Sequence, residues 1–216
     1  MAMRYSIPQG ARLKVLSVSG KVHVIAEDRS DVEIDPPERR IENSDDGRVM
    51  ETHSKSTNLH IRVPTGMNVS VGSVSGNVEL EGRFGTIKAS TVSGQVKIGD
   101  TQGDADVRSI SGNIDVGDCR GRCRANTKSG HIIISHVANA LKATTMAGNI
   151  EAGIAGGDDV EIKTISGRVA VRVDPGRQPK ARLRSLSGRV RCDCPQGGDF
   201  SLSASTISGS IEVQER

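Results

Sequence analysis

Acidic side chains at a recurring place in the sequence are the first candidates for chemistry. They stand three residues after a repeated glycine, a position that reads in chain order His23, Glu79, Lys97, Asp115, Ile133, Glu151, Ala170, Arg191 and Glu212. General acid–base catalysis needs two carboxylates that converge and differ in pKa. Along this row the acidic residues are mostly separated by basic or apolar ones, which is typical of a solvated face. We therefore predict no catalytic residues and keep a carbohydrate-active enzyme as an alternative.

Cysteine and histidine, the usual ligands of zinc, are both present. Cys123 and Cys192 occupy positions at which other copies of the repeat have apolar residues, so we interpret them as small buried side chains. Local disulfides between Cys119 and Cys123, or between Cys192 and Cys194, stay open as alternatives. No histidine has the spacing of a zinc ligand to another ligand, among His23, His53, His60, His131 and His136. We predict no metal site and no cofactor.

Cations gather toward the C-terminal end of the chain. Between Lys163 and Arg191 the only acidic residue is Asp174. A basic surface can bind nucleic acid, anionic lipid or an acidic polymer, and the near absence of aromatic residues disfavours base reading. A plain solvated basic face is the alternative. The predicted surface for an anionic partner consists of Arg168, Arg172, Arg182, Arg184, Arg189 and Arg191.

One repeat carries all of these residues. A phrase of the form Ser/Thr–hydrophobic–Ser–Gly, with small departures, ends at nine anchor glycines: Gly20, Gly76, Gly94, Gly112, Gly130, Gly148, Gly167, Gly188 and Gly209. From Gly76 to Gly148 the spacing is 18 residues four times, and the later spacings are 19, 21 and 21. A fixed internal period predicts a repeat architecture. The hydroxyl residue three before each glycine is best interpreted as part of a corner, not as a nucleophile.

Apolar residues alternate on both sides of each anchor glycine. Positions two and four after it, and five and seven before it, are apolar in every copy. The position two before it is apolar except at Lys128, and we expect this row, which includes Val18 and Ile207, to be buried as well. A period of two predicts strands with one buried face, and stacking them about 4.8 Å apart gives parallel, in-register sheets.

The predicted fold is therefore all-β: a single-chain parallel β-helix (β-solenoid) of about nine to ten coils of 18–21 residues. Residues 1–66 are expected to form irregular N-terminal coils and a cap, with an inserted hairpin or loop at about 36–58. Residues 67–216 are expected to form the regular solenoid, in one continuous domain. The chain stops one strand after its last anchor glycine, so its C-terminal coil is a candidate surface for end-to-end self-association.

Composition and charge place further bounds on function. The chain has 25 glycines among 216 residues but only three aromatic residues, so its core must be thin and aliphatic. The formal net charge is +3, which indicates a soluble protein and names no partner. No apolar stretch has the length of a membrane span or of a secretory signal. We expect a cytoplasmic protein, with the cell envelope as the alternative if a targeting segment has been removed.

Several phrases have a familiar form, among them Ser75-Gly76-Asn77-Val78-Glu79-Leu80 and Ser111-Gly112-Asn113-Ile114-Asp115-Val116. With Gly10–Gly20 and Ile61–Gly66, they make the chain resemble the bacterial "putative adhesin" family of β-strand-repeat proteins, a domain of unknown function. The resemblance implies a right-handed β-helix and often an envelope context. The favoured function is a non-enzymatic scaffold or adhesin-like binding module, ahead of a self-assembling, bactofilin-like element and a carbohydrate-active β-helix enzyme.

Overall fold

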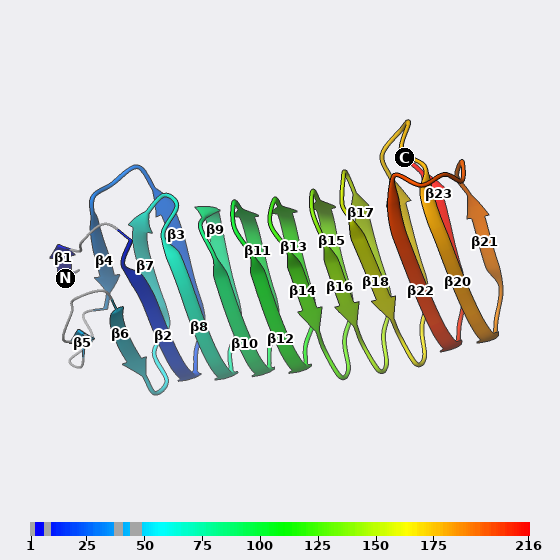
Figure 1. Cartoon of the computed structure of the whole chain (residues 1–216). Coiled ribbons are helices and arrows are strands. Elements are labelled where there is room, and N and C mark those ends of the chain that lie inside the picture. The colour runs from blue at the N-terminus through cyan, green and yellow to red at the C-terminus, as the bar shows by residue number, and fades with distance from the viewer. Residues whose placement is uncertain (1–2, 7–9, 37–40, 44–48) are drawn as a thin grey trace.

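Two long β-sheets face each other across a thin core in the computed structural model, which describes residues 3–6, 10–36, 41–43 and 49–216 (Figure 1). No helix occurs among these residues, and hence none that could cross a membrane. The all-β solenoid that the repeat predicts is confirmed. Strands before an anchor glycine belong to one sheet, and strands after it belong to the other.

The strands that follow the anchor glycines make up most of sheet A. Its order is β1 (Met3–Ser6), β4 (Asp31–Asp35), β7 (Leu59–Pro64), β3 (Val22–Glu27), β9 (Val78–Phe84), β11 (Val96–Thr101), β13 (Ile114–Cys119), β15 (Ile132–Val137), β17 (Ile150–Ile154), β19 (Val169–Val173), β23 (Ile211–Glu215) and β21 (Val190–Asp193). All pairs are parallel except β1–β4 and β4–β7.

The strands that precede the anchor glycines make up most of sheet B. Its order is β20 (Pro179–Ser187), β22 (Phe200–Ser208), β18 (Asp159–Lys163), β16 (Leu141–Thr144), β14 (Cys123–Asn126), β12 (Ala105–Ser111), β10 (Ile87–Ser93), β8 (Asn68–Ser75), β2 (Arg12–Ser19), β6 (Val49–Ser54) and β5 (Ile41–Asn43). Only β5–β6 is antiparallel.

The register stacks equivalent residues of the repeat on one another, as the sequence predicts. Val96, for example, pairs with Val78 on one side and Ile114 on the other. These inward valines and isoleucines are at most 1 % exposed, except Val190 on the outermost strand, which is 42 % exposed. Burial of these rows, which the period of two predicts, removes apolar surface from water along the whole rod.

One row lies on the opposite side from the one expected. The residues two before each glycine are exposed, for instance 54 % at Val18 and 51 % at Ile207, and they do not enter the core. The hydroxyl residues one position earlier are buried in their place, as at Thr145, which is 1 % exposed. In an extended strand neighbouring side chains point to opposite faces, so an inward hydroxyl forces the next side chain outward.

The buried hydroxyls and the glycines form the corner together. Thr145 Oγ1 donates to the carbonyl of Gly130 on the neighbouring coil at 3.4 Å, and Ser185 Oγ donates to that of Gly209 at 2.9 Å. A Cβ on Gly209 would lie 2.0 Å from the oxygen of Gly167, so no larger residue fits. These hydroxyls bond backbone carbonyls at a corner that favours glycine, whereas those of Ser73, Thr91 and Ser109 are buried without a hydrogen-bond partner among the described residues.

Coils at both ends are out of sequence order. The last strands of the chain, β22 and β23, lie between β18/β19 and β20/β21. The C-terminal coil is therefore covered on both sides, and the expectation that it forms the end of the rod is wrong. A physical reason is that β22 buries Phe200 and Leu202 fully, whereas β20 alternates Ala181 and Leu183 with arginines. The more apolar coil gains more from being covered.

The N-terminal end has a similar exchange. Strands β2 and β3 lie between β6/β7 and β8/β9, and the antiparallel strands β1, β4 and β5 extend the two sheets beyond them. The insertion expected at about 36–58 includes residues 37–40 and 44–48, which lie outside the described residues. Its described part contains β5 and the regular strand β6.

Candidate functional site

The six arginines predicted to bind an anionic partner lie on two coils that do not touch. Arg168 and Arg172 belong to the coil of β19, whereas Arg182, Arg184, Arg189 and Arg191 belong to β20, β21 and the turn between them. The coil of β22 and β23 separates the two groups. We call β20, β21 and their connecting turn the end coil. The structure thus divides the predicted surface, with four of its arginines on the end coil.

Carboxylates neutralise the part of this surface that lies on sheet A. The guanidinium group of Arg168 pairs with Glu212 of β23. Arg191 Nε lies 2.5 Å from Asp193 Oδ2 on the same strand. Exposed pairs of this kind contribute little to stability, but they reduce the local positive potential. Sheet A therefore offers an anion less net charge than the sequence suggests.

Sheet B carries the uncompensated part. Lys180, Arg182 and Arg184 alternate along the outer face of β20, and none of them forms an ion pair with a described residue. Their cross-strand neighbours on β22 are Ser201, Ser203 and Ser205, which carry no charge. By contrast, Lys88 and Arg124 in mid-solenoid both face Asp106. Three exposed cations in line, without an ion pair among the described residues and with Lys180 added to the predicted set, give this strand a local excess of positive charge.

An exposed apolar row crosses the corner of every regular coil. We call it the apolar ladder, and its order in space is Val18, Val74, Val92, Ile110, Met146, Ile165, Ile207 and Leu186. Lys128 interrupts it between Ile110 and Met146. Leu186, on the end coil, is 84 % exposed, the most of any of these residues. An extended row of exposed apolar side chains, here broken at Lys128, is unusual on a protein surface and is typical of an interaction site.

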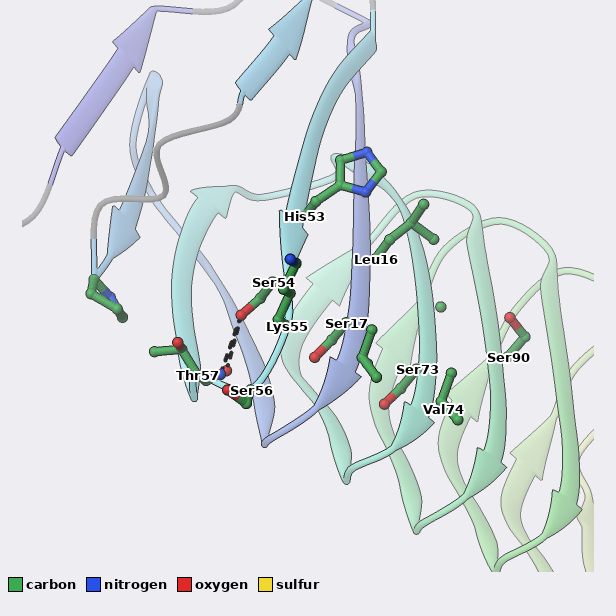
Figure 2. A pocket seen from close by; sticks show the side chains of 13 residues that line it. Leu16, Ser17, His53, Ser54, Lys55, Ser56, Thr57, Ser73, Val74 and Ser90 are labelled. Carbon is green, nitrogen blue, oxygen red and sulfur yellow. Dashed lines mark hydrogen bonds between the residues drawn. The ribbon is translucent and has the colours of Figure 1, made fainter.

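A groove lies at the N-terminal end of the apolar ladder, on the outer side of sheet B (Figure 2). Its volume is about 930 Å³. Leu16 and Val18 from β2, His53 from β6 and Val74 from β8 line it, together with several serines. Sequence reasoning missed it because β2, which carries Leu16, lies next to β8 only after the coil exchange.

Backbone geometry shapes that groove locally. A Cβ at Gly72 would lie 2.8 Å from Leu16 Cδ2, so the glycine makes room for the leucine to lie across the neighbouring strand. At the far wall the Ser54 hydroxyl bonds the backbone of Thr57, with distances of 3.3 and 3.4 Å. The groove therefore combines an apolar floor with hydroxyl groups, which suits a ligand of mixed polarity.

All four cysteines are free thiols, so neither of the two local disulfides is present. Cys119 and Cys123 are buried, and for Cys123 its apolar position in the repeat predicts this. Cys192 and Cys194 are half-buried on the end coil, with their sulfur atoms 3.1 Å apart. Burial, followed by the hydrogen bond with Cys192, raises the pKa of the Cys194 thiol to about 12.

One histidine does lie next to other metal-ligand types, contrary to expectation. His23 on β3 faces Glu79 on β9, and the ligand atoms of His23, Glu79 and Glu81 all lie within 4.8 Å of one another. The residues are 56 and 58 positions apart in sequence, a separation that no zinc-motif spacing covers. His131 has a structural role, because its Nδ1 accepts the backbone N–H of Asn149 at 3.1 Å.

Comparison with known proteins supports the solenoid as a family fold. The family model described as Toastrack DUF4097 matches residues 14–216. A putative adhesin from Bacteroides fragilis has a similar structure, with a TM-score of 0.61 at 14 % identity over 99 % of this chain and 96 % of that one. A putative cell adhesion protein from Clostridium sporogenes aligns with a TM-score of 0.28 at 12 % identity, over 100 % and 99 % of the two chains. No curated protein matches.

Proposed function

This chain belongs to the Toastrack DUF4097 family, whose function is unknown, and we propose that it is a non-enzymatic binding module. The proposed ligand is an anionic polymer or surface, and the proposed binding surface is the end coil. A rigid solenoid that carries its binding surface at one tip is compatible with the adhesin name of the solved relative. At 14 % identity that relative supports the fold and leaves the ligand to be inferred from this chain's own residues.

The cations of β20 carry this proposal. Lys180, Arg182 and Arg184 are exposed, aligned and without an ion pair among the described residues, and their cross-strand neighbours are serines. Arginine donors suit carboxylate, sulfate and phosphate groups alike. Because the strand is the outermost one of sheet B, no further strand among the described residues restricts access to it.

Heparin, a sulfated polysaccharide, serves as the probe for a polyanion, and vesicles with anionic headgroups serve as the probe for a surface. We expect retention on immobilised heparin that weakens with salt, because exposed charges are screened. The double variant Arg182→Glu with Arg184→Glu should lose that retention. Sedimentation with the vesicles then tells whether an anionic surface is bound through the same residues.

A matched control reverses two exposed cations in mid-solenoid, Arg120→Glu with Lys128→Glu, and changes the net charge equally. It should elute close to the unmodified protein. Equal losses in the two double variants would show that only net charge matters and would overturn the end-coil site. Absence of retention at low salt, with anionic vesicles also unbound, would end the proposal.

A second candidate function is self-association through the same end coil. Its inward residues Leu183 and Cys192 are only half-buried, and Leu186 is 84 % exposed. Strands β20 and β21 are each the last strand of a sheet, and no described strand pairs with their outer edges, although the Gln196 side chain accepts the N–H of Ala181 at 3.2 Å. Exposed edges and uncovered core residues favour the addition of another chain.

Sedimentation velocity over a range of concentrations tests this second function. We expect an oligomer that Leu186→Lys weakens and that Val92→Lys, a charge at the middle of the apolar ladder, leaves unchanged. Loss with Val92→Lys alone would move the interface to the ladder. A monomer at every concentration would reject self-association.

A further inference from the structure

Three potential metal ligands converge on the outer face of sheet A near the N-terminal end of the rod. His23 lies on β3, and Glu79 and Glu81 lie on β9, its neighbour in the sheet. His23 is directly opposite Glu79, and Glu81 is the next outward residue along β9. A single ligand atom from each residue falls within 4.8 Å of the other two.

The geometry points to a site for a divalent transition-metal cation of the zinc class, bound by His23, Glu79 and Glu81. Imidazole nitrogen and carboxylate oxygen are both zinc ligands, with bonds of about 2.0–2.2 Å. Two ligand atoms of a tetrahedron with such bonds lie roughly 3.3 Å apart. His23 Nε2 and Glu81 Oε1 are already 3.3 Å apart. A small rotation of the Glu79 carboxylate would complete three protein ligands and leave a fourth position for water.

The imidazole nitrogen supplies an independent indication of a ligand. His23 Nε2 is buried but makes no hydrogen bond, although Glu81 is within ion-pair distance. A buried polar atom without a hydrogen bond is destabilising, and a metal ion would satisfy it. The ring of His60 on β7 packs edge-on against that of His23, with 5.5 Å between centroids, and fixes its orientation.

The charges around the cluster are compatible with cation binding. A hydrogen bond from Lys21 lowers the pKa of Glu79, and the nearby charges of Lys21, His23 and Lys97 add to the effect. Lys97 Nζ lies 4.0 Å from Glu79 Oε1, so two lysines already face this carboxylate. Lys21 competes for this carboxylate, so we expect moderate affinity and not that of a closed structural zinc site.

Metal binding at this site would have a structural consequence. Strands β3 and β9 are adjacent only because β2 and β3 lie between two later coils. A cation held by both strands would fasten that exchanged coil to the body of the solenoid. Binding only to the folded chain raises stability by mass action, so the metal should raise the unfolding midpoint.

Calorimetric titration of Zn²⁺ into the full chain at neutral pH tests the inference. The background carries Cys192→Ser and Cys194→Ser, because two adjacent thiols are potential zinc ligands and would compete with the proposed site, and any histidine tag is removed. We expect one site, with affinity reduced at least about tenfold by His23→Gln, since even residues behind the ligands change affinity by 10–100-fold. Co²⁺ should give the visible absorption of a low-coordinate site and lose it in the same variant.

His136→Gln is the matched control, because His136 Nδ1 pairs with the single carboxylate of Asp118 at 2.9 Å. It should leave the affinity unchanged. Glu81→Gln provides a second test at an exposed position, where a folding defect is not expected. Absence of the site, or equal losses in His23→Gln and His136→Gln, would overturn the inference.

Discussion

The two ends of the rod protect their sheets in different ways. At the N-terminal end, antiparallel strands β1, β4 and β5 extend the sheets, and Arg29 holds the carboxylates of Asp31 and Glu33. At the C-terminal end, β20 and β21 remain parallel to the coil below them, and β20 carries three cations that form no ion pair with a described residue. One end is thus closed by a change of strand direction and by ion pairs, and the other has exposed cations and the hydrogen bonds of Gln196 to Ala181 and Cys192.

Burial near each end shows what this difference does to the core. Val32 and Ile34, on a strand next to the edge of sheet A, are 0 % exposed. Leu183 and Cys192, on the outermost strands at the other end, are only half-buried. Chain that folds back across the N-terminal end completes its core, whereas no described strand covers the end coil, where the Gln196 side chain contacts Cys192 Sγ at 3.0 Å. The difference makes the C-terminal tip the end from which binding or assembly can start.

Core truncation should give the largest contrast between the ends. Ile34→Ala is expected to lower the free energy of unfolding by about 3 kcal/mol, since it removes a fully buried side chain. Leu183→Ala should cost roughly 1 kcal/mol or less, because that side chain is already partly hydrated. Urea unfolding of both variants measures the two values. Equal costs would show that the end coil is covered in solution.

Lowering the pH should destabilise the N-terminal end of the rod before the C-terminal end coil. A hydrogen bond from Arg29 is the main cause of the lowered pKa values of Asp31 and Glu33, and the charges of Arg62 and Arg4 add to the effect at Glu33. A carboxylate with a depressed folded pKa stabilises the fold fully above its unfolded pKa, about 4.3 for Glu33. That stability is lost as the pH falls further, through the folded pKa.

Hydrogen exchange measured from about pH 6 to pH 3 follows this loss, with rates corrected for their intrinsic pH dependence. Protection in β4 should fall in the acid range, while the arginines of the end coil keep their charge. Glu33→Gln should flatten the change in β4. The control Glu151→Gln, at an exposed residue without an ion pair among the described residues, should not. Uniform loss of protection along the rod would contradict a local effect.

The sequence predicts the interior of the rod well and its ends poorly. Each mid-solenoid coil has the same neighbours in sequence and in space, so counting from a glycine such as Gly112 places Ile114 and Val116 correctly in the core. The exposed row at Val18 was also within reach of the sequence, because an odd step from the buried positions reverses the side chain. The prediction fails because it assumes that an apolar residue is buried and ignores whether its position is an odd or an even number of residues from the buried ones.

The exchanged coils could not be predicted in this way. Neighbouring copies of a repeat fit equally well in several orders, and the choice depends on small differences in burial and on the reach of the connecting loops. The groove at Leu16 and the cluster at His23 both depend on the N-terminal exchange. The divided set of arginines depends on the C-terminal one. The candidate functional features therefore lie where sequence order and spatial order differ.

The reactivity of the cysteine thiols should show the smallest difference between the open end and the rest of the rod, but it reports on single residues. Cys119 and Cys123 are at most 1 % exposed, whereas Cys192 and Cys194 lie half-buried on the open end coil. When the native protein reacts with an aromatic disulfide reagent such as DTNB, only Cys192 and Cys194 should react and release the coloured thiolate of the reagent. Because Cys194 has a pKa of about 12 and stays protonated near pH 8, Cys192 should react first.

The second release then follows within the protein. Cys192 forms a mixed disulfide and expels one reagent thiolate, and the sulfur of Cys194, 3.1 Å away, displaces the other as it loses its proton. The product is a Cys192–Cys194 disulfide with no added reagent mass, which mass spectrometry can verify. Cys192→Ser should suppress both fast releases, and Cys119→Ser should leave them unchanged. Rapid reaction of all four thiols would show that the core opens as readily as the end coil, and the contrast between the two ends would then be lost.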